Sequence, residues 1–209
     1  MQFSVDELVG AESVLTKQLP ENQTLFSLGD ECSHYVIVQT GMVRVELLST
    51  MGQHLLLYRI QEGQSCIMTT SCLMGNSRYF AQAISETPVE LILIPQAIFH
   101  TNLKETLTFR EFVFNNFSER LAVMLDRTAD LAICSVDQRL AAVLLAHINP
   151  HNKDHLISLT HEQLAIEIGS AREVVSRRLS QFEKIGLVEK QRGFIRIIDP
   201  EKLSLLLAS

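Results

Sequence analysis

The chain has 209 residues, 46% of them hydrophobic, which is enough for two domains with separate cores. Its formal net charge of −6 argues against a protein that coats nucleic acid without selectivity, because that affinity comes from many phosphate contacts. No apolar run approaches the roughly 18 residues of a membrane span. The start MQFSVDELVG is acidic where a signal peptide is basic, so we expect a cytoplasmic protein with no membrane partner.

The first part of the chain is punctuated by glycines every eleven or twelve residues. These are Gly29, Gly41, Gly52, Gly63 and Gly75. The runs between them, such as YVIVQ, VRVEL and LLLYRI, are β-branched or alternate in polarity. Turn signals at this interval, with alternating patterning, are typical of an antiparallel sandwich or jelly roll. We therefore predict a β-roll domain over residues 1–104.

Residues 105–134 are expected to form one long helix. They contain no Gly or Pro, and apolar residues recur in steps of seven, three and four. The stripe either packs on the β-roll or meets its own copy across a two-fold axis, and its narrow width favours a homodimer. The predicted interface residues are Phe114, Phe117, Leu121, Met124, Thr128 and Leu131.

A third segment, residues 135–209, is predicted to be a separate domain. Ser135 and Gln138 have the spacing of a capping box, which begins the helix DQRLAAVLLAHI. The hinge between domains is therefore expected near Cys134–Asp137. Residues 1–150 hold 9 Lys/Arg and 16 Asp/Glu, whereas residues 151–209 hold 9 and 8, so the acidic part is not the part that binds nucleic acid.

Two short helices around a glycine turn are predicted in this domain. Thr160 with Gln163 forms a capping box, and so does Ser170 with Glu173, so two helices begin ten residues apart. Between them, Gly169 can adopt the left-handed conformation that ends the first helix. The residues expected to face inward are Leu164, Ala165, Ile168, Val174, Val175 and Leu179. This is the spacing of a helix–turn–helix, which binds double-stranded DNA.

The second of these helices carries a polar arc that suits the major groove of DNA. The residues on it are Arg172, Glu173, Ser176, Arg177 and Ser180. Glu173 can accept from a cytosine or adenine amino group, Arg177 can pair with guanine O6 and N7, and Ser176 can adapt to either kind of edge. Arg178 lies nearer the apolar side and is left out of the predicted set.

The segment GLVEKQRGFIRIID then predicts two short strands around Arg192 and Gly193, the wing of a winged helix. Lys190, Arg192 and Arg196 can meet phosphates there, although a solvated hairpin has the same composition. Thr160 and Arg192 complete the predicted DNA-binding set.

The whole chain resembles the CRP/FNR superfamily of bacterial transcription regulators. The segments that carry the resemblance are SLGDECSHYVIVQTGMVRV, FREFVFNNFSERL, DQRLAAVLL and GSAREVVSRRL. The resemblance implies an α+β protein with a β-roll of the cyclic-nucleotide-binding type, a dimerisation helix and a C-terminal winged helix–turn–helix. It also implies a homodimer on a palindromic operator, with RNA polymerase as a further partner.

Within this superfamily, Glu173, Ser176 and Arg177 resemble the fumarate-nitrate type of reader, whose half-site centres on TTGAT. Arg172, however, is the residue expected of the cyclic-AMP-receptor type, so both half-sites stay open. Cyclic-AMP receptors are expected to carry Gly-Glu and Arg-Ser-Ala in the effector loop, where this chain reads Met68-Thr69 and Tyr79-Phe80-Ala81. Without that arginine a buried phosphate is unpaired, so cyclic AMP is not expected, unless Arg78 compensates through a shifted alignment.

Cys66 and Cys72 lie where the effector loop is expected, and they are the predicted sensor of thiol redox state or reactive sulfur. A disulfide between them needs Cα atoms within about 7 Å, and hence a turn or helix through Thr69–Ser71. Buried cysteines that act only as small hydrophobes are the alternative. A small ligand, a nucleotide or haem in the roll is another way to switch the same regulator.

The sequence does not support a metal centre or a catalytic site. The spacing of the cysteines gives no support to an iron–sulfur cluster. His34, His54 and His100 are isolated histidines, and none of them is a specific candidate for a haem ligand. No HxH pair of the kind that a metal-dependent cupin enzyme needs is present, and no nucleophile–base pairing emerges. We therefore expect that the protein is not an enzyme, and the sequence assigns it no certain cofactor.

Overall fold

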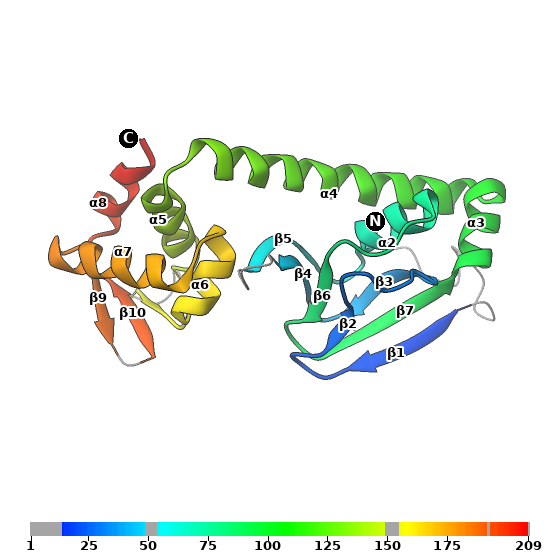
Figure 1. Ribbon diagram of the computed structural model, residues 1–209, viewed down its shortest axis with the longest axis horizontal. Coiled ribbons are helices and arrows are strands. Elements are labelled where there is room, and N and C mark those ends of the chain that lie inside the picture. Colours follow the sequence, from blue (N-terminus) through cyan, green and yellow to red (C-terminus); the bar gives the residue numbers. More distant parts are fainter. Residues whose placement is uncertain (1–13, 49–53, 149–154, 192, 209) are drawn as a thin grey trace. The chain divides into compact units, whose positions relative to one another are not determined.

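The computed structural model describes residues 14–48, 54–148, 155–191 and 193–208 (Figure 1). By its internal contacts the chain divides into two compact units. One takes residues 1–47 and 57–126, and the other takes residues 48–56 and 127–209. The division falls inside the long helix, ahead of the hinge expected at Cys134–Asp137.

The first unit is built on a β-roll, as the glycine spacing predicted. Its strands are β1 (Leu15–Leu19), β2 (Thr24–Phe26), β3 (His34–Thr40), β4 (Val43–Leu48), β5 (His54–Ile60), β6 (Gln82–Ser85) and β7 (Val89–Pro95). They form two sheets, ordered β1-β7-β3 and β2-β6-β4-β5. Gly41, between β3 and β4, has φ of +85°, and a Cβ there would collide with the carbonyl oxygen of Pro88. This turn therefore requires glycine.

Strand β3 is buried on both faces, which explains its continuous apolar run. Val36 and Val38 belong to the main core cluster of the roll. Tyr35 belongs to a second cluster that includes Phe99 of α3 (Gln96–Glu105) and Phe109 of α4 (Leu107–Ile133). The ring centroids of Tyr35 and Phe99 are 5.0 Å apart, and those of Tyr35 and Phe109 are 5.9 Å apart. Aromatic packing thus attaches α3 and the start of α4 to the sheet.

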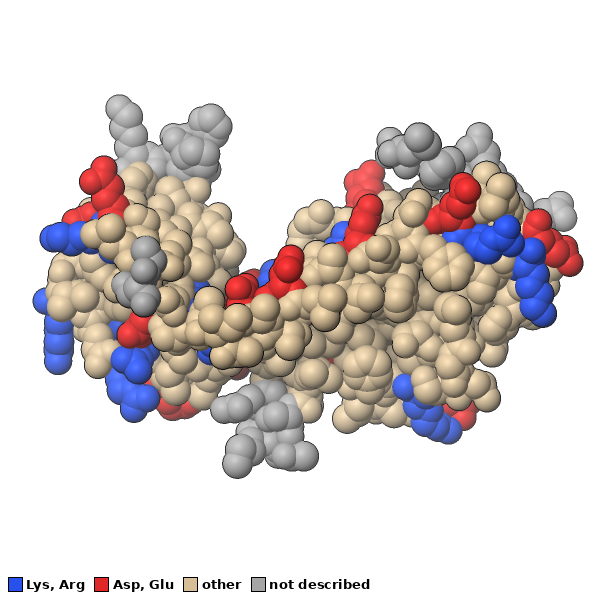
Figure 2. All heavy atoms as spheres, turned by 90° about the horizontal axis from the view of Figure 1, so that it is seen from above, with Lys and Arg blue, Asp and Glu red and all other residues tan. Residues whose placement is uncertain are grey.

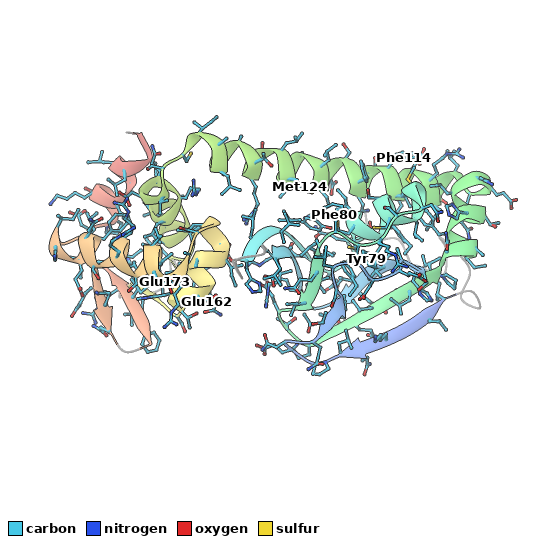
Figure 3. All side chains as sticks on the ribbon, in the orientation of Figure 1. Tyr79, Phe80, Phe114, Met124, Glu162 and Glu173 are labelled. Atoms are coloured by element: carbon cyan, nitrogen blue, oxygen red, sulfur yellow. The ribbon has the colours of Figure 1, made fainter. Side chains whose placement is uncertain are left out.

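The predicted dimer stripe is divided between a covered and an exposed face of α4. Phe117 and Met124 pack against the core of the roll. Phe114 and Leu121, by contrast, are 51% and 42% exposed. Figure 3 shows Met124 on the side of α4 toward the strands and Phe114 on the outer side. At 3.6 residues per turn, a step of three residues moves around the helix by about 60°, so the stripe spans two adjacent faces.

The predicted stripe residues are distributed unequally between the covered and the outer face of α4. On the outer face, Phe114 and Leu121 are followed by Thr128, which is also exposed, and by Leu125, which is 61% exposed. Figure 2 shows mainly uncharged side chains along α4. Leu131 is half-buried and lies among residues of the second unit. An apolar stripe of Phe114, Leu121 and Leu125 is therefore exposed on α4, and the dimer interface itself stays a prediction.

The second unit consists of short helices around a small sheet. Its elements after α4 are α5 (Val136–Ala146), β8 (Leu156–Ile157), α6 (His161–Ile168), α7 (Arg172–Lys184), β9 (Val188–Gln191), β10 (Phe194–Ile197), α8 (Pro200–Leu205) and the 3-10 turn η2 (Leu206–Ala208). The sheet has the order β8-β10-β9. Leu140, Leu144, Leu164 and Leu179 are fully buried in its core. In α5 the capping box predicted for Ser135 and Gln138 is present.

Within the part of the chain that the structure describes, no helix is both long enough and apolar enough to cross a membrane.

Candidate nucleic-acid interface

The turn between α6 and α7 has the helix–turn–helix geometry that the sequence predicted. Thr160 Oγ1 accepts from the backbone N–H of Gln163 at 3.1 Å, and the Gln163 side chain accepts from the Thr160 N–H at 2.8 Å. Gly169 ends α6 in the left-handed conformation, with φ of 61°. Because Thr160 is engaged as this cap, its role is to begin α6; a DNA contact from its hydroxyl stays a prediction.

The second predicted capping box is absent. Helix α7 begins one residue later, with Ala171 as its N-cap, and no side chain caps it. Ser170 instead completes the end of α6, because its backbone N–H donates to the Ala165 carbonyl at 2.9 Å. This bond spans five residues, as in the Schellman motif that follows a left-handed glycine. Glu173 is therefore not used as a cap.

The inner faces of the two helices are packed largely as predicted. Leu164 and Ile168 of α6, and Val175 and Leu179 of α7, are buried. Val174 is only half-buried, because it lies between the packed face and the polar arc of α7. Both helices are thus held by one apolar core, which leaves the opposite arc of α7 to solvent.

That polar arc carries three long, exposed side chains. Arg172, Glu173 and Arg177 are all exposed, and Ser176 between them is half-buried. Among the described residues, none of these four side chains has a hydrogen-bond or ion-pair partner. Glu173 is labelled in Figure 3. Two cations and one anion at the start of α7 are therefore available for an outside partner.

The fifth residue predicted on this arc, Ser180, is engaged inside the domain. Its hydroxyl donates to the Ser176 carbonyl at 2.9 Å and accepts from Lys190 Nζ at 2.9 Å. Lys190 also forms an ion pair with Glu183 at 3.0 Å. These contacts fasten β9 of the wing to α7, so Ser180 and Lys190 are better described as positioning groups than as free contacts. Sequence spacing gives no sign of this, because Ser180 and Lys190 lie in different elements.

The wing itself is present, and two of its predicted phosphate contacts are paired internally. Strands β9 and β10 are antiparallel, and Gly193 between them has φ of +85°. Arg196 Nη1 lies 3.5 Å from Glu189 Oε2. Lys190 is the other paired residue, through its ion pair with Glu183. The third predicted contact, Arg192, lies outside the described residues. Arg178, which is not in the predicted DNA-binding set, forms an ion pair with Asp137 of α5 at 3.3 Å.

The positive charges near the start of α6 affect a histidine that is not in the predicted DNA-binding set. His161 is the first residue of α6. Its pKa is lowered by burial first, and then by the nearby charges of Lys190 and Arg172. Lys190 and Arg172 are therefore close enough to act on one site at the start of α6. The sequence does not indicate this environment of His161, because Lys190 lies in β9 of the wing and approaches His161 only in the folded domain.

Several residues of the effector region of the roll pack against other residues of the same domain. Met68 and Thr69 lie on α2 (Ile67–Gly75), and both are buried. Thr69 Oγ1 donates to the Cys66 carbonyl at 2.7 Å and accepts from the Val36 N–H at 3.3 Å. Tyr79 stacks on Phe26 with ring centroids 3.9 Å apart. Thr69 and Tyr79 are thus engaged with other residues of the roll, in the region where the family resemblance implies ligand contacts.

Arg78, which a shifted alignment offers as the cation for a cyclic phosphate, is paired with other groups. Its Nη2 lies 2.6 Å from Glu31 Oε1, and its Nη1 donates to the Gly29 carbonyl at 2.8 Å. The Arg78 and Glu31 side chains are 63% and 79% exposed, so the pair lies at the surface. A role of Arg78 toward a cyclic phosphate stays an alternative, and it would require Arg78 to leave Glu31.

The two predicted sensor cysteines lie on one helix but far apart along it. Cys66 is the N-cap of α2, and Cys72 lies two turns later. At 1.5 Å per residue, six residues of helix separate their Cα atoms by roughly 9 Å, more than the about 7 Å that a disulfide spans. The helix predicted through Thr69–Ser71 exists, but it keeps the sulfur atoms apart as long as α2 is intact.

Burial also makes both thiols poor nucleophiles. It raises the pKa of Cys66 to about 11, and the fully buried Cys66 sulfur lies 3.7 Å from the Tyr58 hydroxyl. Burial likewise raises the pKa of Cys72, whose Sγ donates to the Arg78 carbonyl at 3.5 Å. No group of three or more metal-ligating side chains occurs among the described residues. In this conformation the cysteines are packed, protonated groups.

Comparison with known proteins agrees with both units. Residues 16–106 match the cyclic nucleotide-binding domain, and residues 138–206 match the Crp-like helix-turn-helix domain. The chain is 29% identical over 178 residues to the transcriptional regulator SdrP of Thermus thermophilus, covering 82% of this chain and 83% of that protein. It is 25% identical over 202 residues to the global nitrogen regulator of Nostoc sp., covering 93% and 90%.

Solved structures give the same result. A transcriptional regulator of the CRP/FNR family from Eubacterium rectale is 26% identical, with a TM-score of 0.83 over 97% of this chain and 93% of that one. The regulator TTHA1359 of Thermus thermophilus shares the fold at 23% identity, with a TM-score of 0.74 over 93% and 99%. The chain therefore belongs to the CRP/FNR family of DNA-binding transcription regulators, which are not enzymes, and it joins an effector-binding β-roll to a helix–turn–helix.

Proposed function

We propose that this regulator binds a TTGAT-like palindrome as a homodimer, with α7 in the major groove. One observation carries the proposal: Arg172, Glu173 and Arg177 are exposed on one arc of α7 and have no partner among the described residues. The neighbouring cations Arg178 and Lys190 are paired inside the domain. The side chains that remain free are those that can reach base edges.

Each free side chain suits one kind of base edge. The Arg177 guanidinium can donate two parallel hydrogen bonds to O6 and N7 of the guanine in TTGAT. The Glu173 carboxylate can accept from the amino group of a cytosine or adenine on either strand. Arg172, at the first position of α7, lies close enough to the start of α6 to lower the pKa of His161. We assign base readout to Glu173 and Arg177 and a base or phosphate contact to Arg172.

The test is direct binding of the full-length protein to a fluorescein-labelled TTGAT-N4-ATCAA duplex, followed by fluorescence anisotropy. A duplex of the same composition with scrambled half-sites is the matched control. Tighter binding to the palindrome by at least tenfold is expected, since each specific base pair adds about 1–3 kcal/mol. Equal binding to both duplexes would mean that α7 contacts only phosphates, and no binding to either would put the half-site assignment at fault.

The homodimer follows from the open apolar stripe on α4, formed by Phe114, Leu121 and Leu125. These residues recur in steps of seven and four and are between 42% and 61% exposed. Steps of this kind form the seam of a two-stranded coiled coil. Two copies joined along such a seam present two copies of α7, as the two half-sites of a palindrome require.

For the signal, we propose oxidation of Cys66 and Cys72 coupled to unwinding of α2. The start of α2 has no side-chain cap from Cys66 and no acidic residue in its first turn. The Met68 N–H donates to the Tyr58 hydroxyl at 3.2 Å and the Val36 N–H donates to Thr69 Oγ1 at 3.3 Å, so unwinding has to break these contacts. Once α2 unwinds, the two thiols can meet, and a diazene oxidant such as diamide accepts their two electrons and two protons as the disulfide forms. Loss of α2 would remove Met68 and Cys72 from the core of the roll.

Diamide treatment of the reduced protein tests this switch, with the disulfide located by peptide mass spectrometry. A Cys66–Cys72 bond and a change in duplex affinity are expected, and both should be absent in Cys66→Ser and Cys72→Ser. Cys134→Ser is the control, because Cys134 lies outside the roll. Affinity that does not respond to diamide would make these cysteines structural. A small ligand, a nucleotide or haem would then be the signal to seek.

A further inference from the structure

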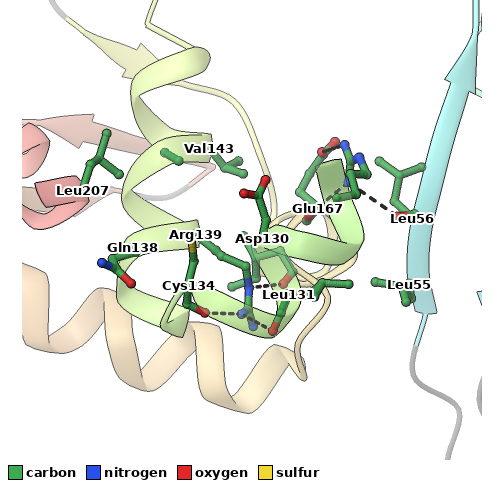
Figure 4. Close-up of a pocket in the computed structure, with 13 residues that line it drawn as sticks. Leu55, Leu56, Asp130, Leu131, Cys134, Gln138, Arg139, Val143, Glu167 and Leu207 are labelled. Atoms are coloured by element: carbon green, nitrogen blue, oxygen red, sulfur yellow. Dashed lines mark hydrogen bonds and ion pairs between the residues drawn. The ribbon is translucent and has the colours of Figure 1, made fainter. Parts of the chain in front are cut away.

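One side chain, Arg139 of α5, ties the end of α4 to the helix–turn–helix (Figure 4). Its Nη1 donates to the carbonyl oxygens of Cys134 at 2.6 Å and Leu131 at 3.4 Å, where α4 ends. Its Nε donates to the carbonyl oxygen of Ile168 at 2.9 Å, the last residue of α6. A single guanidinium thus joins the C-terminal ends of two helices.

The chemistry of these groups explains the arrangement. The last carbonyl groups of a helix have no partner within the helix and carry the negative end of its dipole. A guanidinium is always charged and has several donors in a rigid fork, so it can serve two helix ends at once. Lysine has one flexible ammonium group and cannot keep both ends in fixed geometry. Arginine is therefore suited to this position for its shape as well as its charge.

An apolar contact lies beside this polar one. A Cβ built on Gly169 would come within 2.8 Å of Leu131 Cδ2. Gly169 also has the positive φ that ends α6, so glycine serves two needs at the turn. The last turn of α4 therefore packs on the backbone of the turn that connects α6 to α7.

An ion pair makes a third link between the same elements. Arg127 of α4 lies 3.7 Å from the carboxylate of Glu167, and its Nη1 donates to the Glu167 carbonyl oxygen at 3.4 Å. All these residues belong to the second compact unit, which begins within α4 at Arg127. The last turn of α4 and the helix–turn–helix thus share a set of local contacts.

We infer that Arg139 is a positioning residue for DNA binding: it holds the turn before α7 against the last turn of α4, so that α4 sets the placement of the reading helix α7. Arg139 is half-buried and its hydrogen bonds go to the ends of α4 and α6, whereas Arg172 and Arg177 are exposed on α7. It acts through Ile168 and the turn, and it need not touch DNA. The inference rests on the proposed DNA-binding function.

A cavity of about 370 Å³ borders Arg139 and leaves room for a variant side chain. Its lining includes Asp130, Gln138, Val143 and Leu207 (Figure 4). Glutamine at position 139 is shorter than arginine and does not crowd this space, so Arg139→Gln removes the bridge without overpacking. Arg139→Lys keeps the positive charge but not the fork.

The matched control is Arg110, which has the same kind of contact in the other unit. Arg110 Nη1 donates to the carbonyl oxygens of Lys104 at 3.2 Å and Leu103 at 3.5 Å, at the end of α3. Arg110→Gln removes a guanidinium from a helix end without affecting the helix–turn–helix. A general effect of losing one arginine should appear in both variants, and a positioning effect should appear only at Arg139.

The experiment measures palindrome affinity of the full-length variants, with hydrogen exchange of the peptides over residues 127–134 and 172–184. For Arg139→Gln and Arg139→Lys we expect affinity to fall about tenfold, with faster exchange at 127–134 and unchanged exchange in α7. Arg110→Gln should bind like the wild type. Wild-type affinity in Arg139→Gln, or recovery of affinity in Arg139→Lys, would overturn the inference; failure of the wild type to bind would instead refute the proposed function.

A second variant guards against simple unfolding of the domain. Leu131→Ala removes the apolar half of the same junction and leaves every hydrogen bond of Arg139 in place, because these bonds go to backbone carbonyls. If both residues position one turn, the affinity losses of Leu131→Ala and Arg139→Gln should be clearly less than multiplicative in the double variant. Multiplicative losses would mean that they act independently, and the inference would fail.

Discussion

The ammonium of Lys190 lies 3.0 Å from Oε2 of Glu183, and the backbone N–H of Lys190 donates to Oε1 of the same carboxylate at 3.0 Å. Both oxygen atoms of one side chain on α7 thus hold one residue of the wing. The wing is therefore fixed to the reading helix by a carboxylate with two partners, which is stronger than either contact alone.

This relationship predicts how stability depends on pH. The Lys190 backbone and side-chain hydrogen bonds lower the pKa of Glu183 below its ordinary 4.5. A carboxylate with a lowered pKa contributes stability above its unfolded pKa, and that contribution is lost as pH falls through the folded value. The melting temperature of Glu183→Gln should thus lie below that of the wild type at pH 7, and the difference should shrink as pH falls through the folded-state pKa, which lies below 4.5. A difference that persists unchanged at the lowest pH would contradict the assignment.

Arg177 is expected to provide sequence selectivity. Arg177→Ala should cost about 1–3 kcal/mol in binding to TTGAT-N4-ATCAA and relax the preference at one guanine. Anisotropy titrations against duplexes substituted at each half-site position check this. Lys184→Ala is the control, because Lys184 is an exposed cation at the far end of the same helix. Equal loss on every duplex would place Arg177 on phosphate instead.

Leu121 is expected to lie at the centre of the dimer seam. Leu121→Glu puts a charge into the apolar stripe and should convert the dimer to monomer, as measured by sedimentation velocity. Val123→Glu is the matched control, since Val123 is 37% exposed on the same helix but two residues on, roughly 200° around it. A Leu121→Glu variant that still sediments as a dimer would show that two copies meet elsewhere.

Cys66 should react slowly with alkylating reagents in the folded protein. With a pKa of about 11 in place of 9.0, its thiolate fraction at pH 8 falls about a hundredfold. Iodoacetamide labelling followed by mass spectrometry should show Cys66 protected in buffer and labelled in urea, with the half-buried Cys134 as internal reference. Labelling of Cys66 at the same rate in both conditions would mean that α2 is open in the native protein.

The elements of this protein were largely predictable because their signals are local. Turn glycines marked the hairpins of the roll, and the Thr160 and Ser135 capping boxes marked the starts of α6 and α5. The Ser170 box failed, since Ser170 can serve either the end of α6 or the start of α7, and the Schellman bond to Ala165 decides between them. Local patterns cannot settle such a competition when both outcomes use the same residue.

By itself, the sequence determined the order of the domains, the kinds of element in each, and the polar arc of α7, because these depend on dihedral preferences and on the period of the chain. Only the tertiary structure decided which polar groups stay free. Lys190 holds Ser180, Asp137 holds Arg178 and Glu31 holds Arg78, in each case across elements distant in sequence. It also decided that Phe117 and Met124 face the roll while Leu121 and Leu125 do not. Pairing and burial depend on which surfaces meet in space, and that information is not carried by the spacing of residues along one segment.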